Sequence, residues 1–255
     1  MISPYHTLIT GASRGLGRAL ALECARRRMN LILVSLPGEW LHDLAASIRV
    51  TYRVEVIAIE MDLCGEGVCE RLFRIVSNRE IKIHMLINNM EQANPCRDTN
   101  DRDAGERLRC SELATAELTH RFLPMLRENG PSYILNRKPI RENPEGMKDR
   151  HPSFLGAMTY RLRRELRGSN IHVSLLCPGQ MKSGETNNPC REKLHRPARF
   201  SAINTEQLAS LAIDGLLRRS ARIYPGCRQR VMAFLERYVP ANEIKMGRRK
   251  LHPFQ

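Results

Sequence analysis

Residues 10–17 read TGASRGLG, and they stand between the apolar pair Leu8–Ile9 and an amphipathic helical pattern. Their glycines, Gly11, Gly15 and Gly17, have the spacing GxxxGxG. A strand that turns tightly into a helix, and lets its backbone approach a phosphate closely, needs glycines in the turn. The following helix presents its positive amino terminus to that phosphate. This stretch therefore predicts a phosphate-binding turn after the first strand of an α/β fold.

Apolar runs and helical patterns alternate along the rest of the chain. The runs that indicate strands cover residues 6–9, 31–34, 54–59, 84–88, 133–136, 172–177 and 222–224. The helical patterns cover residues 16–29, 39–49, 66–78, 105–128, 153–167, 205–219 and 228–238. Alternating strands and helices form parallel sheets with right-handed crossovers. We therefore expect an α/β fold with a doubly wound parallel sheet of the Rossmann type, with about seven strands and helices on both faces.

We find no internal repeat and no linker, so residues 1–244 are expected to form one domain and residues 245–255 a basic tail. Two long polar segments, residues 91–107 and 180–204, follow predicted strands. Ligands of open parallel sheets bind beyond the carboxyl ends of the strands. Both segments are therefore expected near a ligand site, and the second has the position of a lid.

The charge of the chain is strongly positive. Lys and Arg number 41 against 27 Asp and Glu, which makes the formal charge +14, and 34 of the basic residues are Arg. Such an excess favours polyanion binding. However, most basic clusters fall on or at the ends of predicted helices, where cations stabilise the helix dipole. We expect at most weak, nonspecific polyanion binding, through the tail.

The cysteines and the amino terminus bear on the compartment. The chain has eight cysteines, no CxxC motif, and no histidine at zinc-ligand spacing from a cysteine pair, so no metal site is predicted. Cys24 and Cys177 stand in apolar runs and are expected in the core. The first ten residues do not have a signal-peptide pattern, and no window approaches the ~18 apolar residues of a membrane span. We expect a cytoplasmic, reducing location and no membrane contact.

Several motifs occur in the order in which one enzyme family carries them. Asp62–Leu63 follows the third predicted strand, Leu86–Asn89 reads LINN, and Cys177–Gly179 reads CPG. With TGASRGLG, these motifs resemble the short-chain dehydrogenase/reductase family over nearly the whole chain. The resemblance implies an NAD(P)-dependent oxidoreductase fold. It implies cofactor binding by Gly11, Ser13, Arg14, Gly15, Leu16, Gly17, Ser35, Asp62, Leu63, Asn88, Pro178 and Gly179.

The family's catalytic residues are not found at the matching positions. The family uses a tyrosine, a lysine four residues later, a serine and an asparagine, and no YxxxK motif occurs in this chain. Counting from the helix end at Glu165 places Lys148 and Pro152 at the tyrosine and lysine positions. A shifted register would place Phe154 and Met158 there. Neither register supplies a titratable hydroxyl beside a cation, which the proton transfer requires.

The other two catalytic positions depart as well. Where the family reads N-x-S-S, this chain reads Asn136-Arg137-Lys138-Pro139, and counting back from Pro124 places Ser111 at the asparagine position. Positioned acid–base groups contribute ~10²–10⁴ in rate and act as a unit. We therefore assign no catalytic residue and expect no useful reductase turnover.

A rearranged site remains an alternative. Tyr160 and Arg164 have the i,i+4 spacing, although Tyr160 comes about two turns too late, so we expect it to pack against a helix. Lys148 is a second candidate base. Helices five and six form the dimer interface in many members of the family. The arginines at 161, 163, 164 and 167, on the predicted helix 153–167, put that interface in doubt, and a homo-oligomer stays an open possibility.

The type of cofactor follows from charge. The second strand ends without the acidic residue that a ribose 2′-hydroxyl prefers, and Arg14 offers a cation for a 2′-phosphate. This pattern favours NADP over NAD, while Glu39 opposes it. Met90 and Glu91 stand where the family has small residues, and they oppose cofactor binding altogether. Three hypotheses stay open: a non-catalytic NADP(H)-binding protein, an active reductase with a rearranged site, and a basic protein that binds nucleic acid or another polyanion.

Overall fold

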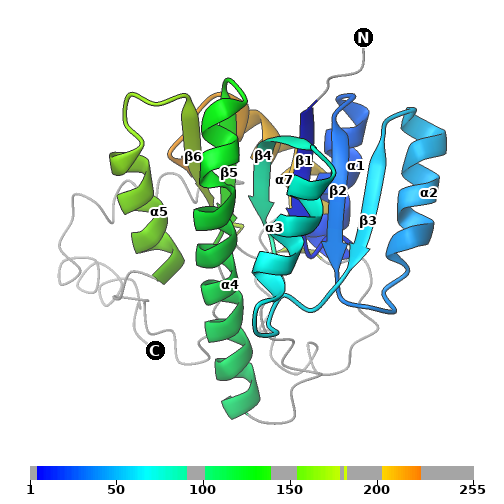
Figure 1. The fold of residues 1–255 in the computed structure, drawn as a ribbon, viewed down its shortest axis with the longest axis horizontal. Coiled ribbons are helices and arrows are strands. Elements are labelled where there is room, and N and C mark those ends of the chain that lie inside the picture. The colour runs from blue at the N-terminus through cyan, green and yellow to red at the C-terminus, as the bar shows by residue number, and fades with distance from the viewer. Residues whose placement is uncertain (1–4, 91–100, 139–153, 179–180, 183–202, 225–255) are drawn as a thin grey trace, which may run out of the picture.

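Seven of the described strands form one parallel sheet (Figure 1). The computed structural model describes residues 5–90, 101–138, 154–178, 181–182 and 203–224. The strand order is β3-β2-β1-β4-β5-β6-β9, so the direction of growth reverses between β1 and β4. The strands are β1 (Tyr5–Thr10), β2 (Asn30–Ser35), β3 (Val56–Glu60), β4 (Lys82–Asn88), β5 (Ser132–Arg137), β6 (Ile171–Leu176) and β9 (Arg222–Ile223). The predicted doubly wound sheet is confirmed.

Helices cover both faces of this sheet (Figure 1). The helices are α1 (Gly15–Arg26), α2 (Leu41–Tyr52), α3 (Val68–Asn78), α4 (Asp101–Glu128), α5 (Phe154–Glu165) and α7 (Thr205–Leu217). On one face α1 packs between α2 and α7, and on the other α4 packs between α3 and α5. The long helix α4 extends past the carboxyl edge of the strands (Figure 1).

The apolar core has two halves, one on each face of the sheet. Side chains alternate between the faces along a strand, so neighbouring residues enter different halves. In β1, Ile9 joins the cluster under α1, α2 and α7, and Leu8 joins the cluster under α3, α4 and α5. Both side chains are fully buried. Burial on both faces explains why the strands read as continuous apolar runs.

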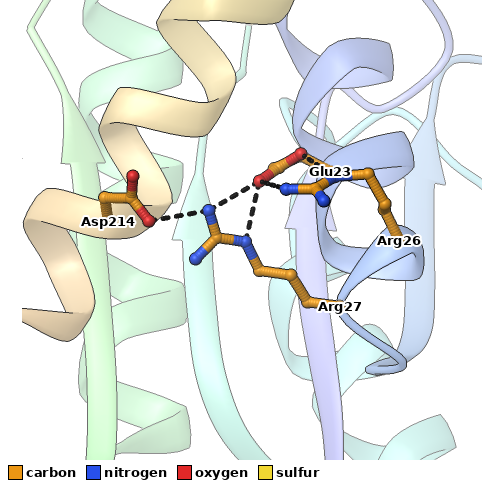
Figure 2. Close-up of polar contacts among 4 residues, drawn as sticks. All are labelled: Glu23, Arg26, Arg27 and Asp214. Atoms are coloured by element: carbon orange, nitrogen blue, oxygen red, sulfur yellow. Dashed lines mark hydrogen bonds and ion pairs between the residues drawn. The ribbon is translucent and has the colours of Figure 1, made fainter.

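An ion-pair network joins α1 to α7 (Figure 2). Arg27 follows the last turn of α1 and donates from Nε to Glu23 Oε1 at 2.7 Å and from Nη2 to Asp214 Oδ1 at 2.7 Å. Arg26 also donates to Glu23, at 2.8 Å. Hydrogen bonds from Arg26, and to a smaller extent from Arg27, lower the pKa of the Glu23 carboxyl to about 2. One arginine of the basic run 26–28 therefore holds two helices together.

The element boundaries differ from the prediction at a few places. Helix α1 ends at Arg26 and not at residue 29, because Arg28 adopts a left-handed conformation with φ 62°. Likewise α2 begins after Trp40, whose φ is 57°. A two-stranded ribbon, β7 (Met181–Lys182) and β8 (Ile203–Asn204), was not predicted. The predicted helix 228–238 and the basic tail lie outside the described residues.

No helix among the described residues is both long enough and apolar enough to span a bilayer. The division into one domain and a tail stays a prediction.

Candidate functional site

The glycine turn connects β1 to α1 at the switch point of the sheet. Gly11 and Gly15 have φ values of 63° and 51°, which glycine adopts without steric cost. A Cβ on Gly17 would lie 1.8 Å from the carbonyl oxygen of Gly11, so only glycine fits there. Leu16 is buried and anchors the first turn of the helix. The predicted turn thus leaves backbone N–H groups at the start of α1 for an anion.

Asn89 braces this turn from the neighbouring strand. Its backbone N–H donates to Thr10 Oγ1 at 3.1 Å, and its Nδ2 donates to the carbonyl oxygens of Thr10 and Gly11 at 3.4 and 3.3 Å. The LINN motif predicts a cofactor-binding role for Asn88. Asn88 instead donates across the sheet to Asn136 Oδ1 at 2.8 Å and to Thr119 Oγ1 at 3.1 Å. The second asparagine of the motif, and not the first, contacts the glycine turn.

Arg14 and Ser13 both contact Glu39, from the loop that follows β2. Ser13 Oγ donates to Glu39 Oε2 at 2.5 Å, and Arg14 Nη2 lies 3.2 Å from Glu39 Oε1. The Glu39 side chain is 17% exposed, and that of Arg14 is 36% exposed. The cation that would attract a 2′-phosphate is therefore already neutralised by a carboxylate.

The ends of β2 and β3 form the other side of this edge. Ser35 is buried, and its carbonyl oxygen accepts from the backbone N–H of Met61 at 2.8 Å. Asp62 follows at once, is exposed, and accepts from the backbone N–H of Cys64 at 2.9 Å. Leu63 is buried among α3 and α4 residues. Of these predicted residues, the structure places Ser35 and Asp62 together at the carboxyl edge of the sheet.

A buried polar ladder runs from α4 through the sheet to α5. Besides its bond to Asn88, Asn136 donates from Nδ2 to Thr159 Oγ1 at 3.0 Å. Thr119 and Thr159 each donate to a carbonyl oxygen one turn earlier in their own helix. These four residues are at most 3% exposed, and within the described part of the chain Asn88 Oδ1 makes no hydrogen bond. The ladder fixes the helices against β4 and β5 and presents no titratable group.

Lys138 and Pro139 stand where the family has its two serines, and Arg137 directly precedes them. Arg137 donates from Nη1 to Asn89 Oδ1 at 3.3 Å, which places its guanidinium beside the glycine turn. The Lys138 backbone N–H donates to the carbonyl oxygen of Leu176. Ser111 donates to the Leu108 carbonyl within α4, at 2.9 Å. The positions Pro139, Lys148 and Pro152 lie outside the described residues.

The alternative pair Tyr160 and Arg164 lies on the surface. Tyr160 is 59% exposed, and the Arg164 guanidinium carbon lies 6.0 Å from its ring centroid. The expectation that Tyr160 packs against another helix is therefore wrong within the described part of the chain. The aromatic ring extends along α5, where a neighbouring cation can stack on it.

The remaining predicted residues lie at or beyond the ends of the described segments. Pro178 is buried, whereas Gly179 and Glu91 lie outside the described residues. Met90 is half-buried and packs on the apolar cluster under α3 and α4. Burial raises the pKa of the Cys177 thiol at the end of β6. Cys24 is fully buried as expected, while Cys177 is only half-buried.

The fold and the glycine turn together define a class of protein. It is a doubly wound α/β protein whose first strand is followed by the type of turn that binds the phosphates of a dinucleotide. The family model described as short chain dehydrogenase matches residues 5–137, more than half of the chain. The chain belongs to this family of oxidoreductases.

Individual relatives agree with this assignment. The 1-deoxy-11-beta-hydroxypentalenate dehydrogenase of Streptomyces exfoliatus is 27% identical over 185 residues, which cover 68% of this chain and 66% of that protein. The very-long-chain 3-oxoacyl-CoA reductase of Debaryomyces hansenii is 27% identical over 47% of this chain, and the match spans only 36% of that enzyme. The chain thus matches from about a third to about two thirds of these relatives' length.

Solved structures share the fold. A short-chain dehydrogenase from Sphingobium yanoikuyae in complex with NADPH superposes with a TM-score of 0.69 and 24% identity, covering 98% of this chain and 97% of that chain. A short chain dehydrogenase/reductase from Burkholderia phymatum in complex with NAD gives a TM-score of 0.70 at 19% identity, covering 100% and 99%. At these identities the likeness describes the fold alone.

Proposed function

We propose that this chain is an NADP(H)-binding member of the family that has lost carbonyl reduction. One observation carries the proposal. The glycine turn is fully formed, whereas the residues at the family's catalytic positions are replaced. Gly17 packs against Gly11 so closely that a single Cβ would not fit, and Asn89 holds that turn by three hydrogen bonds. A turn kept in this form, together with Lys138 and Pro139 in the serine positions, supports binding without the family's chemistry.

The residues present fit a nicotinamide dinucleotide. The turn at residues 11–17 would hold the pyrophosphate, and Ser35 with Asp62 would lie beside the adenosine end. The bound group would supply a hydride. Arg137, next to Asn89, would add a positive charge close to the phosphates. The related structures from Sphingobium yanoikuyae and Burkholderia phymatum are complexes with NADPH and with NAD, respectively.

The loss of reduction rests on the proton-transfer groups. Reduction of a carbonyl needs a proton donor at the reacting oxygen as well as the hydride. Lys138 and Pro139 occupy the serine positions, and Ser111 is hydrogen-bonded inside α4. The exposed pair Tyr160–Arg164 lies on the outer side of α5. None of these side chains, among those described, offers the tyrosine–lysine arrangement.

The choice between NADP and NAD depends on the contact of Arg14 with Glu39. A 2′-phosphate gains the Arg14 charge only by drawing Arg14 away from Glu39. A ribose 2′-hydroxyl can instead donate to Glu39 with the contact intact. We therefore propose a preference for NADP(H) of less than about tenfold, since an exposed ion pair is worth about 1 kcal/mol.

A titration with NADPH and NADH tests this function. Trp40 is the single tryptophan, is 79% exposed, and is the neighbour of Glu39, so energy transfer from its emission to the reduced nicotinamide reports binding at this edge. We expect saturable binding, tighter for NADPH, and no carbonyl-dependent oxidation of the bound cofactor. Absence of binding up to millimolar cofactor would reject the proposal. NADPH-dependent reduction of ketones would reject the loss of chemistry, and turnover that is unchanged by Tyr160→Phe would exclude Tyr160 as its proton donor.

A further inference from the structure

Two cysteines far apart in sequence form a disulfide beside the adenosine end of the site. Cys64 lies in the loop between β3 and α3, and Cys110 lies on α4, 46 residues later. Their Cα atoms are 5.5 Å apart, a separation that a disulfide requires. Cys64 comes two residues after Asp62. The bond therefore ties the loop that carries Asp62 to the long helix.

This pair is open to solvent, unlike the other described cysteines of the same region. Cys64 is exposed and Cys110 is half-buried, and both line a cleft of about 300 Å³ between the loop and α4. Burial raises the pKa of Cys69 to about 11 and that of Cys24 to about 12, which keeps these thiols protonated. Thiol–disulfide exchange requires that a thiolate reach a sulfur atom. Among these four residues, the Cys64–Cys110 pair is the one that an external thiol can reach.

The Asp62 side chain is connected directly to this pair. The backbone N–H of Cys64 donates to Asp62 Oδ1 at 2.9 Å, and the N–H of Gly65 donates to the Asp62 carbonyl at 3.2 Å. Met61, the residue before Asp62, donates its backbone N–H to the carbonyl oxygen of Ser35 at the end of β2. A covalent bond from Cys64 to α4 therefore fixes a turn whose other end belongs to the proposed dinucleotide edge.

We propose that Cys64 and Cys110 are a reversible redox pair and that their oxidation strengthens dinucleotide binding. The step is an exchange with a low-molecular-weight disulfide. The two thiols lose two electrons and two protons, one disulfide forms in the protein, and the external disulfide becomes two thiols. In the oxidised form the turn at Asp62 is held in place before the ligand arrives, which reduces the ordering cost of binding. The second part of this inference rests on the proposed function.

Linkage makes the coupling reciprocal. If oxidation tightens NADPH binding by a given factor, saturating NADPH shifts the disulfide equilibrium towards the oxidised form by the same factor. Couplings of this kind amount to about fivefold or more. The same number is therefore accessible from two independent measurements, one of affinity and one of redox state.

The first measurement needs no cofactor. The full chain is equilibrated in glutathione buffers from fully reduced to fully oxidised, its thiols are trapped by alkylation, and the peptides with Cys64 and Cys110 are quantified by mass spectrometry. We expect one two-electron transition for this pair. Thiols that stay reduced in oxidised glutathione, or a disulfide that survives millimolar reduced glutathione, would overturn the redox pair.

The second measurement is NADPH affinity in the two states, read from Trp40 energy transfer. We expect about fivefold tighter binding by the oxidised chain. Cys64→Ser and Cys110→Ser should both bind like the reduced chain at every glutathione ratio. Cys69→Ala removes a buried thiol that contacts the same loop, and it should keep the response. Equal affinity in both states overturns the coupling alone. Absence of binding in both states overturns the proposed function and the coupling with it, whatever the peptide analysis gives.

Discussion

At the glycine turn, the absence of one side chain decides how closely a helix approaches a strand. Gly17→Ala would place a Cβ 1.8 Å from a backbone oxygen and 2.7 Å from Asn89 Nδ2, so α1 would have to move. We expect the free energy of unfolding to fall by about 3 kcal/mol. Since the turn would shift, NADPH affinity should fall roughly tenfold or more. Urea denaturation and the Trp40 titration measure the two effects.

Gly15→Ala is the matched control for this substitution. Gly15, unlike Gly17, has a positive φ, and nothing lies within 4 Å of a Cβ built there. The cost is then the backbone conformation alone, about 1 kcal/mol. Equal losses of stability for the two variants would show that crowding at Gly17 is not what restricts the turn.

We expect the carboxylate of Glu39 to determine the preference between NADPH and NADH. In Glu39→Gln the amide can still accept from Ser13, but the charge that neutralises Arg14 is lost. A 2′-phosphate would then meet an uncompensated cation, and we expect NADPH affinity to rise about threefold to tenfold. NADH affinity should not rise. Parallel titrations with both cofactors give the ratio, and a ratio unchanged from the wild type would remove Glu39 from this role.

Among the elements, α1 and α7 depend on one arginine for their polar contact. Arg27 joins Glu23 to Asp214, and its side chain is only 20% exposed (Figure 2). Arg27→Met keeps an apolar stem but leaves two carboxylates without this donor. We expect a loss of about 2 kcal/mol, typical of hydrogen bonds between charged groups. Urea denaturation at neutral pH measures it.

The neighbouring arginine provides the control. Arg26 contacts the same Glu23 but is 62% exposed and stays within its own helix. Because solvent screens such a pair, Arg26→Met should leave the urea midpoint almost unchanged. If both substitutions lowered the midpoint equally, the contact between the helices would contribute nothing beyond the pairing with Glu23.

The positions of the elements could be predicted because burial on both sheet faces leaves a plain signal. In β2 every residue from Leu31 to Val34 is fully buried, and the sequence shows an unbroken apolar run there. Helix ends were less predictable. Trp40 and Arg28 adopt left-handed conformations, which cannot be predicted from these residue types.

The site was predictable only in part, for a related reason. The glycine spacing specifies its own local geometry, so the turn was foreseen. The role of Asn89 arises from strand pairing, since β1 and β4 lie side by side although they are 77 residues apart at the bond from Thr10 to Ile87. The Cys64–Cys110 pair likewise depends on where α4 crosses the loop after β3. Contacts between distant segments leave no periodic signal in one sequence.

For the whole molecule, the arginine excess has a structural component. Arg163 donates to the carbonyl oxygens of Val173 and Arg219, which joins α5 to β6 and to the end of α7. Arg49 donates twice to the carbonyl oxygen of Val56, at 2.9 and 2.7 Å. Guanidinium groups that satisfy backbone carbonyls stabilise the fold. These hydrogen bonds give the two arginines a structural role that does not require a polyanion. The hypothesis of polyanion binding therefore rests on the tail.

The response to acid joins the histidines and Glu23 in one stability curve. Burial lowers the pKa of His6, His84 and His172 below the ordinary value of 6.5. The unfolded chain then binds protons first as the pH falls below about 6.5, so each histidine removes stability from that pH downwards. Glu23 acts later. Its folded pKa of about 2 lies below 4.5, so its contribution is complete above pH 4.5 and is lost towards pH 2.

Thermal unfolding followed from pH 8 to pH 3 should therefore show two successive losses of Tm. His84 packs with its Nδ1 against the carbonyl oxygen of His6, at 3.2 Å, and His84→Gln removes one titrating group from the upper part of the curve. This variant should flatten the fall of Tm between pH 7 and 5 and leave the lower part intact. Glu23→Gln should do the reverse, flattening the fall below pH 5 because no carboxylate remains to be protonated. A wild-type Tm that is constant from pH 7 to 5 would mean that protonation of the buried histidines does not lower the free energy of unfolding. The burial of His6 and His84 would then not control the acid stability of the sheet.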